Sequence, residues 1–78
     1  MSDRLPRVSA TEVIKVLEKI GFTLSRQSGS HKIYRNAEGM RVTVPYHGNT
    51  TLKLKTFKSI LADAALTVGE FVELLKNS

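Results

Sequence analysis

Apolar side chains recur at helical spacing in three stretches of the chain. The first stretch follows Ser9-Ala10-Thr11-Glu12, a capping-box sequence, and ends before Gly21, a favoured helix-stop residue; it predicts a helix over about residues 10–20. The second stretch predicts a helix that Thr56 caps and that runs to about Ala65. Thr67-Val68-Gly69-Glu70 is another capping box and opens a short last helix. The apolar stripes of these helices comprise Val13, Val16, Leu17 and Ile20, then Phe57, Ile60, Leu61 and Ala64, then Phe71, Leu74 and Leu75.

Three strands are expected between the first two helices. Residues 22–28 alternate, with Phe22 and Leu24 on one face, which predicts a half-buried strand that Gly29 ends. Further strands are expected over about residues 31–36 and 40–45, joined by Asn36-Ala37-Glu38-Gly39 as a type I turn with a glycine bulge. A polar loop follows over residues 46–52. The order predicts a single α+β domain over residues 1–78, built as a two-layer sandwich.

The hairpin turn also predicts a register for the second and third strands. Pairing Asn36 with Met40 places Arg35 opposite Arg41 and His31 opposite Pro45. One face then carries Tyr34, Met40, Val42 and Val44, and the other carries His31, Ile33, Arg35, Arg41 and Thr43. A slip by one residue would bury both arginines, so the pattern favours this register. If the third strand continued beyond Pro45, His47 would be a diagonal neighbour of His31, about 7–8 Å away.

Composition narrows the classes of function. The chain has 78 residues and no cysteine, which excludes disulfides, thiolate metal sites and a cysteine nucleophile. The start of the sequence has no apolar run typical of a secretory signal, and no stretch approaches the ~18 apolar residues of a membrane span, so we expect a cytoplasmic protein without membrane contact. Few carboxylates and two histidines make a poor metal site, and no nucleotide-binding or catalytic-triad motif occurs.

Positive charge is concentrated in the middle of the chain. The net charge is +5, but residues 26–58 alone hold seven basic side chains against Glu38, a net charge of +6. Such a cluster is typical of proteins that bind polyanions, and the alternative is charge that serves solubility alone.

A histidine among cations suits metal-free cleavage of RNA. Imidazole titrates near neutrality, so His31 can take the proton of a ribose 2′-hydroxyl, and the 2′-oxygen then attacks the adjacent phosphorus and expels the 5′-oxygen. A cation such as Lys32, Arg26 or Arg41 can stabilise the charge of the transition state. From the residues alone, the alternative that His31 is an ordinary surface histidine stays open.

Several segments together resemble the HicA toxin family, the small ribonucleases of HicA/HicB toxin–antitoxin pairs. The matching segments, in chain order, are Gly21-Phe22, Gly29-Ser30-His31-Lys32-Ile33-Tyr34, Val42-Thr43-Val44-Pro45-Tyr46-His47, Thr56-Phe57-Lys58-Ser59-Ile60-Leu61 and Phe71. The resemblance implies a double-stranded-RNA-binding-domain-like fold of helix, three strands and helix, here with a short extra C-terminal helix. It implies translation-independent cleavage of mRNA, with His31 as the essential residue. The residues offer no convincing metal site, so we expect the reaction to need neither a metal nor a cofactor. It also implies a HicB-like antitoxin that covers the active face.

The sequence departs from the family pattern at two places. Lys55 stands where the family commonly has glycine, which adds charge near the candidate site. Ala64-Ala65-Leu66 stands where the family often has Ala-Gly-Leu, so we expect the last two helices to join less sharply.

We therefore assign His31 as the catalytic residue, with His47 and Lys32 as candidate assistants. The expected RNA contacts are Arg26, Ser30, Arg35, Arg41, Lys53, Lys55 and Lys58. The main alternative is a non-catalytic RNA-binding domain that holds duplex RNA by shape and phosphate contacts. A DNA-binding regulator is disfavoured, because no helix-turn-helix motif is evident.

Overall fold

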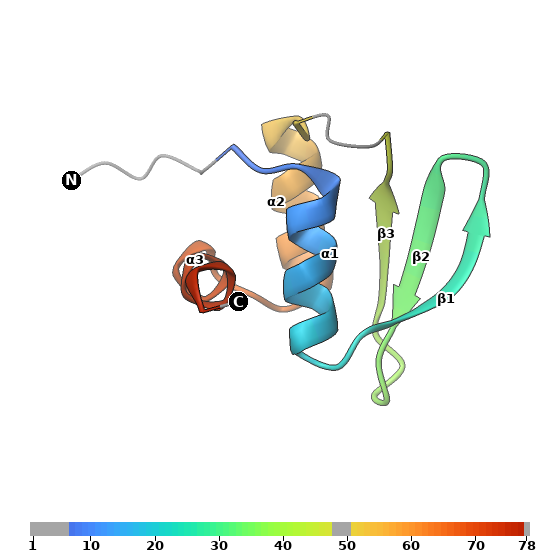
Figure 1. The fold of residues 1–78 in the computed structure, drawn as a ribbon. Helices are drawn as coiled ribbons and strands as arrows, with labels where there is room; N and C mark the ends of the chain where they lie inside the picture. The colour runs from blue at the N-terminus through green and yellow to red at the C-terminus, as the bar shows by residue number, and fades with distance from the viewer. Residues whose placement is uncertain (1–6, 48–50, 78) are drawn as a thin grey trace.

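The computed structural model describes residues 7–47 and 51–77, which form three helices and one three-stranded antiparallel sheet with strand order β1-β2-β3 (Figure 1). The predicted α+β class and element order are confirmed. The elements are α1 (Ala10–Lys19), β1 (Thr23–Ser28), β2 (His31–Arg35), β3 (Arg41–Pro45), α2 (Leu54–Asp63) and α3 (Val68–Lys76).

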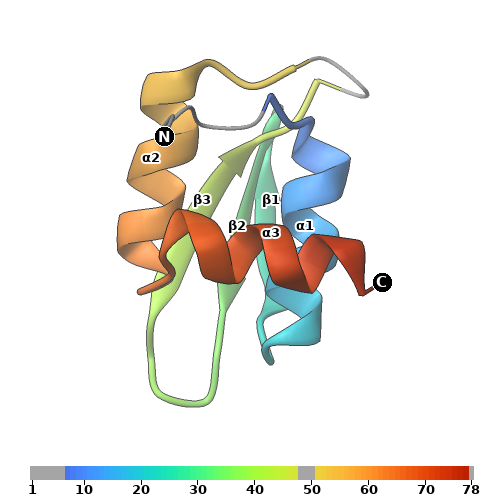
Figure 2. The same ribbon diagram turned by 90° about the vertical axis from the view of Figure 1, so that its left-hand side faces the viewer.

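Helices α1 and α2 cover one face of the sheet, with α2 beside β3, and α3 crosses both helices on the side away from the sheet (Figures 1 and 2). Among the described residues, no helix lies on the opposite face of the sheet in either view. None of the helices in the described part of the chain has the length and apolar character that a membrane span requires.

The predicted capping box and the predicted glycine ending of α1 are both present. The Ser9 hydroxyl accepts a hydrogen bond from the Glu12 amide, and the Glu12 carboxylate accepts one from the Ser9 amide. Gly21 has a φ of 98°, and the Phe22 amide donates to the Leu17 carbonyl at 2.9 Å. This left-handed ending directs the chain from α1 into the sheet.

The predicted start of α2 is wrong. The N-cap is Lys53, in an extended conformation, and Thr56 lies within the first turn. The chain before α2 is held by a contact distant in sequence: the Leu52 amide donates to the Val8 carbonyl at 2.8 Å, and Ser9 pairs with Thr51. Since this pairing determines where the helix begins, the Thr56 hydroxyl has no capping role.

The expected loose junction between α2 and α3 is also wrong. Ala65 adopts a φ of 58°, and the Leu66 amide donates to the Leu61 carbonyl at 2.9 Å, which completes a sharp helix ending without glycine. Thr67 and Glu70 then form the predicted capping box of α3.

The predicted register of the β2–β3 hairpin is confirmed. Arg35 lies opposite Arg41, and His31 lies opposite Pro45. In the turn, the Gly39 amide donates to the Asn36 carbonyl at 3.1 Å, and Gly39 has a φ of 83°, as a type I turn with a glycine bulge requires.

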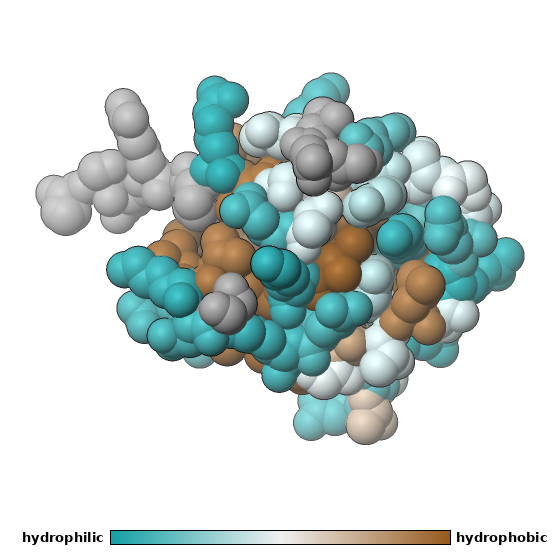
Figure 3. Space-filling view, viewed as in Figure 1, coloured by the Kyte–Doolittle hydropathy of each residue, from teal (hydrophilic) through white to brown (hydrophobic). Residues whose placement is uncertain are grey.

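Strand β1 is more exposed than predicted. Leu24 pairs with Tyr34 and therefore lies on the helix side of the sheet, yet it is 49% exposed. The reason is that β1 is the edge strand that extends beyond the helices (Figure 1), and hydrophilic residues dominate this side of the molecule in Figure 3.

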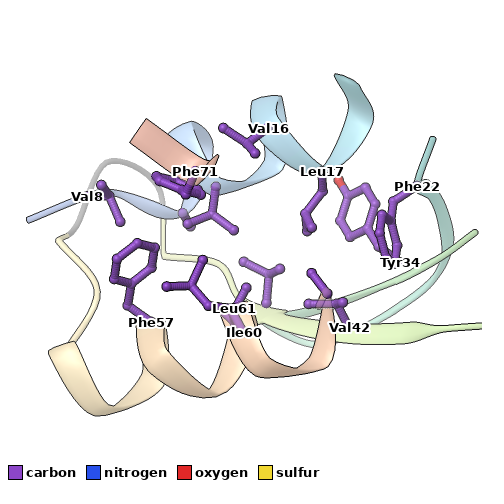
Figure 4. Packing of buried hydrophobic residues seen from close by; sticks show 14 residues of the cluster. Val8, Val16, Leu17, Phe22, Tyr34, Val42, Phe57, Ile60, Leu61 and Phe71 are labelled. Carbon is purple, nitrogen blue, oxygen red and sulfur yellow. The ribbon is translucent and has the colours of Figure 1, made fainter. Parts of the chain in front are cut away.

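The core lies between the sheet and the helices (Figure 4). Phe71 is the buried residue of α3, and its ring meets that of Phe57 edge to face, with centroids 4.9 Å apart. On the sheet side, Tyr34, Val42 and Val44 are buried, as the register predicted. Their burial leaves the alternate residues of β2 and β3 on the face without helices.

Candidate functional site

The turn before β2 places His31 at the rim of the sheet. Gly29 and Ser30 connect β1 to β2, and the closing pair of this hairpin is Ser28 with His31. Gly29 has a φ of 59°, a left-handed conformation that glycine adopts without strain, which accounts for the glycine in the Gly-Ser-His segment. His31 is exposed and lies on the face without helices, directly opposite Pro45 of β3.

A groove of about 310 Å³ connects His31 to α2. Its sheet wall consists of His31, Thr43 and Pro45, which share one face of β2 and β3. Its helix wall consists of Lys55, Thr56, Ser59 and Ile60. The groove is therefore lined by a histidine, a lysine and three residues that carry hydroxyl groups, a set that can bind a phosphate and accept a proton.

His47 lines a second groove, together with Thr51, Leu52 and Lys53. Pro45 and Thr56 line both grooves, so the two hollows adjoin. Strand β3 ends at Pro45, so the condition for a diagonal pairing of His31 and His47 is not met. The two histidines instead lie in neighbouring grooves.

Three expected RNA contacts lie on the sheet face that carries His31. Arg26 pairs with Ile33, and Arg35 pairs with Arg41, so all three arginines project from the same face as His31. They are exposed. The face therefore combines the candidate base with a positively charged surface.

The remaining expected contacts are distributed around the site. Lys55 lines the His31 groove and Lys53 lines the His47 groove. Ser30 lies in the turn before His31, where its carbonyl accepts a hydrogen bond from the Tyr46 amide. Lys58 is exposed on α2 and belongs to neither groove.

Lys32 lies on the other face of the sheet from His31. It pairs with buried Val44, and its ammonium group lies 3.9 Å from the centroid of the Tyr46 ring. Successive residues of a strand project to opposite faces, so this cation points away from the His31 groove.

Sequence reasoning missed the hydroxyl residues of the groove. The sequence pattern predicts a helix cap at Thr56 and assigns no functional role to Thr43 or Ser59. The available signal was the helical spacing of Thr56 and Ser59, three residues apart and therefore on one face of α2.

The start of α2 is electropositive. Lys53 makes no side-chain cap hydrogen bond, and the first turn contains no acidic residue. The amide groups of a helix N-terminus carry partial positive charge, to which Lys53 and Lys55 add. In the described part of the chain, no three His, Asp or Glu side chains are grouped closely enough to hold a metal ion.

Away from the grooves, Tyr34 has a perturbed environment. Burial raises the pKa of its phenol, and the charge of Glu18 and the neighbouring Tyr46 raise it further. Its ring packs in the core, so we assign it a structural role.

Comparison with known proteins identifies the family. The family model for the HicA toxin of bacterial toxin–antitoxin systems matches residues 10–66. No curated protein matches the chain. The matched range contains α1, the whole sheet and α2, and hence both walls of the His31 groove. Since the match covers most of the 78 residues, this chain belongs to the HicA toxin family of bacterial toxin–antitoxin systems.

Proposed function

We propose that this protein is a metal-independent endoribonuclease that cleaves mRNA, with His31 as the catalytic residue. The observation that carries the proposal is the position of His31: exposed, on the arginine-bearing face, in a groove with Lys55 and hydroxyl groups. A solvent-accessible imidazole beside a cation is what 2′-hydroxyl activation requires.

In this mechanism, neutral His31 accepts the proton of the ribose 2′-hydroxyl. The 2′-oxygen forms a bond to the adjacent phosphorus, and the bond from phosphorus to the 5′-oxygen breaks. The products are a 2′,3′-cyclic phosphate and a 5′-hydroxyl, whose proton comes from the imidazolium or from water. Lys55 stabilises the negative charge that the phosphorane gains, because it lines the same groove. His47, in the adjoining groove, is the candidate for assisting the leaving group.

The arginines of the open sheet face bind the flanking RNA. Arg35 and Arg41 are directly opposite, and like charges in this arrangement repel. A phosphate between them relieves the repulsion, which supports binding of a polyanion on this face. RNA rather than DNA is the substrate, because the nucleophile is the 2′-hydroxyl.

A HicB-like antitoxin is the proposed protein partner, and both act in the cytoplasm. Membership of the HicA family supports the partner, since HicA toxins are paired with HicB antitoxins. We propose that the antitoxin covers the face that carries His31, where it would exclude RNA.

The second candidate function is RNA binding without cleavage. The exposed arginines favour it as much as they favour catalysis, because phosphate contacts need no imidazole. The two functions differ in what they require of His31.

Controlled expression of wild type, His31→Ala and His47→Ala separates the two candidates. We expect wild type to arrest growth and deplete mRNA, and His31→Ala to do neither while keeping its fold. His47→Ala tests the second imidazole separately: a growth arrest as strong as that of wild type would exclude His47 from the reaction. Equal effects of wild type and His31→Ala would contradict catalysis by His31.

The chemistry is tested on purified protein and an RNA transcript. Cleavage should persist in excess EDTA and leave 2′,3′-cyclic phosphate ends. Loss of cleavage upon chelation, with recovery upon addition of Mg²⁺, would contradict the metal-independent mechanism.

A further inference from the structure

We propose that the face of α2 formed by Thr56 and Ser59 is a phosphate-binding surface that holds the RNA backbone against His31. The proposal rests on the proposed function for its substrate, but it assigns residues that the proposed reaction does not use. The juxtaposition that carries it is the His31 groove, which these two residues line from α2 while His31, Thr43 and Pro45 line it from the sheet.

The packing of α2 determines where the hydroxyls lie. Phe57, Ile60 and Leu61 are buried and direct one side of the helix toward the core. Thr56 and Ser59 lie outside this buried set, and both line the groove together with Thr43 and Pro45 of β3. Figure 2 shows α2 beside β3, so an extended chain lying in the groove would contact both elements.

Within the part of the chain that the structure describes, the Thr56 and Ser59 hydroxyl groups do not contribute to the hydrogen bonding that holds the fold together. Among residues 7–47 and 51–77, neither the Thr56 nor the Ser59 side chain has a hydrogen-bond partner, and the N-cap is Lys53. Serine and threonine inside a helix are less favourable than alanine. These two residues therefore make α2 slightly less stable than alanine would, and we infer that they are present because they bind a ligand.

The chemistry of the wall fits a phosphodiester. Hydroxyl groups donate to the non-bridging oxygens, and Lys55, four residues before Ser59 on the same helix face, supplies positive charge. Pro45, in the sheet wall of the groove, is conformationally rigid and has no backbone amide donor. The groove volume of about 310 Å³ lies at the lower end of ligand pockets, which span about 300–1,000 Å³, so it fits one sugar–phosphate unit better than a larger ligand.

Thr56 has a particular position because it lines the His47 groove as well. A strand that passes from one groove to the other must cross Thr56 and Pro45. Because Thr56 lines both grooves, its hydroxyl is suited to hold the phosphate that enters the His31 groove, and Ser59 contacts the same sugar–phosphate unit.

The test compares Thr56→Val and Ser59→Ala with wild type, in cleavage of a mixed-sequence RNA transcript at subsaturating concentration. Loss of a hydrogen bond to a charged phosphate should lower the rate by about 10-fold or more for each variant. Thr56→Ser and Ser59→Thr keep the hydroxyl and should restore most of the rate. Thr11→Val is the matched control, since Thr11 is a half-buried threonine in the first turn of α1 and lies outside both grooves.

Binding of a short 2′-O-methyl RNA, which cannot be cleaved, separates this proposal from the proposed function. Wild type should bind it, and the double variant Thr56→Val/Ser59→Ala should bind at least about 10-fold more weakly with an unchanged thermal midpoint. Equal affinities would overturn the phosphate-binding surface even if wild type cleaves RNA. Weaker binding by the double variant, with no cleavage by wild type, would support the surface and overturn the enzyme.

Discussion

The ammonium group of Lys32 lies over the Tyr46 ring, 3.9 Å from its centroid, on the face of the sheet opposite His31. Lys32 follows His31 directly in the sequence, yet the pleat of β2 separates their functions. We expect Lys32→Ala to lower the free energy of unfolding by about 0.5–1 kcal/mol through the lost cation–π contact, with little change in cleavage per folded molecule. Urea unfolding and RNA cleavage measured on the same preparation check this.

Lys55→Ala is the comparison for that prediction. Because Lys55 lines the His31 groove, its removal should lower cleavage and weaken the salt dependence of RNA binding while leaving stability nearly unchanged. The reverse result, with Lys32→Ala abolishing cleavage and Lys55→Ala harmless, would show that the assisting cation comes from the helix side of the sheet.

The parts of the fold that follow from nearby residues were predictable. The Ser9–Glu12 and Thr67–Glu70 boxes predicted two helix starts, and the Asn36–Gly39 turn predicted the pairing of His31 with Pro45. The register was well determined because a slip by one residue would bury Arg35 and Arg41.

The features that were not predictable depend on contacts distant in sequence. The start of α2 depends on backbone pairing of Val8 and Ser9 with Leu52 and Thr51. The same holds for the site. His31 and Lys55 could be named from the sequence, but the roles of Thr56 and Ser59 emerge only when α2 packs against β3.

Ala65 provides a test of backbone strain. It adopts a φ of 58°, which costs a residue with a Cβ about 1–2 kcal/mol but costs glycine nothing. After the greater unfolded-state entropy of glycine is subtracted, Ala65→Gly should stabilise the protein by about 0.5–1 kcal/mol. The thermal midpoint should rise by several degrees, since about 1 kcal/mol corresponds to roughly 4–8 °C in a domain of this size.

The control is the same substitution within the helix. Ala62 is exposed in the last turn of α2, so Ala62→Gly should lower the stability by up to about 1 kcal/mol. If both variants were destabilised, the conformation at Ala65 would not be strained as we argue.

The buried phenol of Tyr34 predicts a loss of stability in alkali. Its pKa is raised in the folded state, chiefly by burial, whereas the unfolded chain has the ordinary value of about 10. Between these two values the unfolded state releases the proton and the folded state keeps it. The stabilising contribution is therefore complete below about pH 10 and is lost as the pH rises through the folded-state pKa.

Tyr34→Phe keeps the ring in the core and removes the titrating group. The free energy of unfolding of this variant should fall less than that of wild type between about pH 8 and about pH 11. Tyr46→Phe should have a smaller effect in the same direction, because burial is the largest cause of the raised pKa of Tyr34 and Tyr46 is a lesser one. Identical losses in wild type and Tyr34→Phe would assign the alkaline transition to other groups.

Substitution of Lys53 tests whether this residue lowers the stability of α2 while it increases the affinity for RNA. It is the N-cap residue, already in the extended conformation that a cap requires, yet it makes no side-chain cap hydrogen bond. Lys53→Asp should cap the helix and complement its dipole, which raises the stability by about 1 kcal/mol.

Lys53→Asp should also weaken RNA binding and cleavage, because a cation of the His47 groove becomes an anion. Lys53→Ser supplies the cap without the negative charge, so both its thermal midpoint and its RNA affinity should lie between those of wild type and of the aspartate variant. An aspartate variant that is more stable and cleaves RNA as fast as wild type would remove Lys53 from the RNA-binding surface.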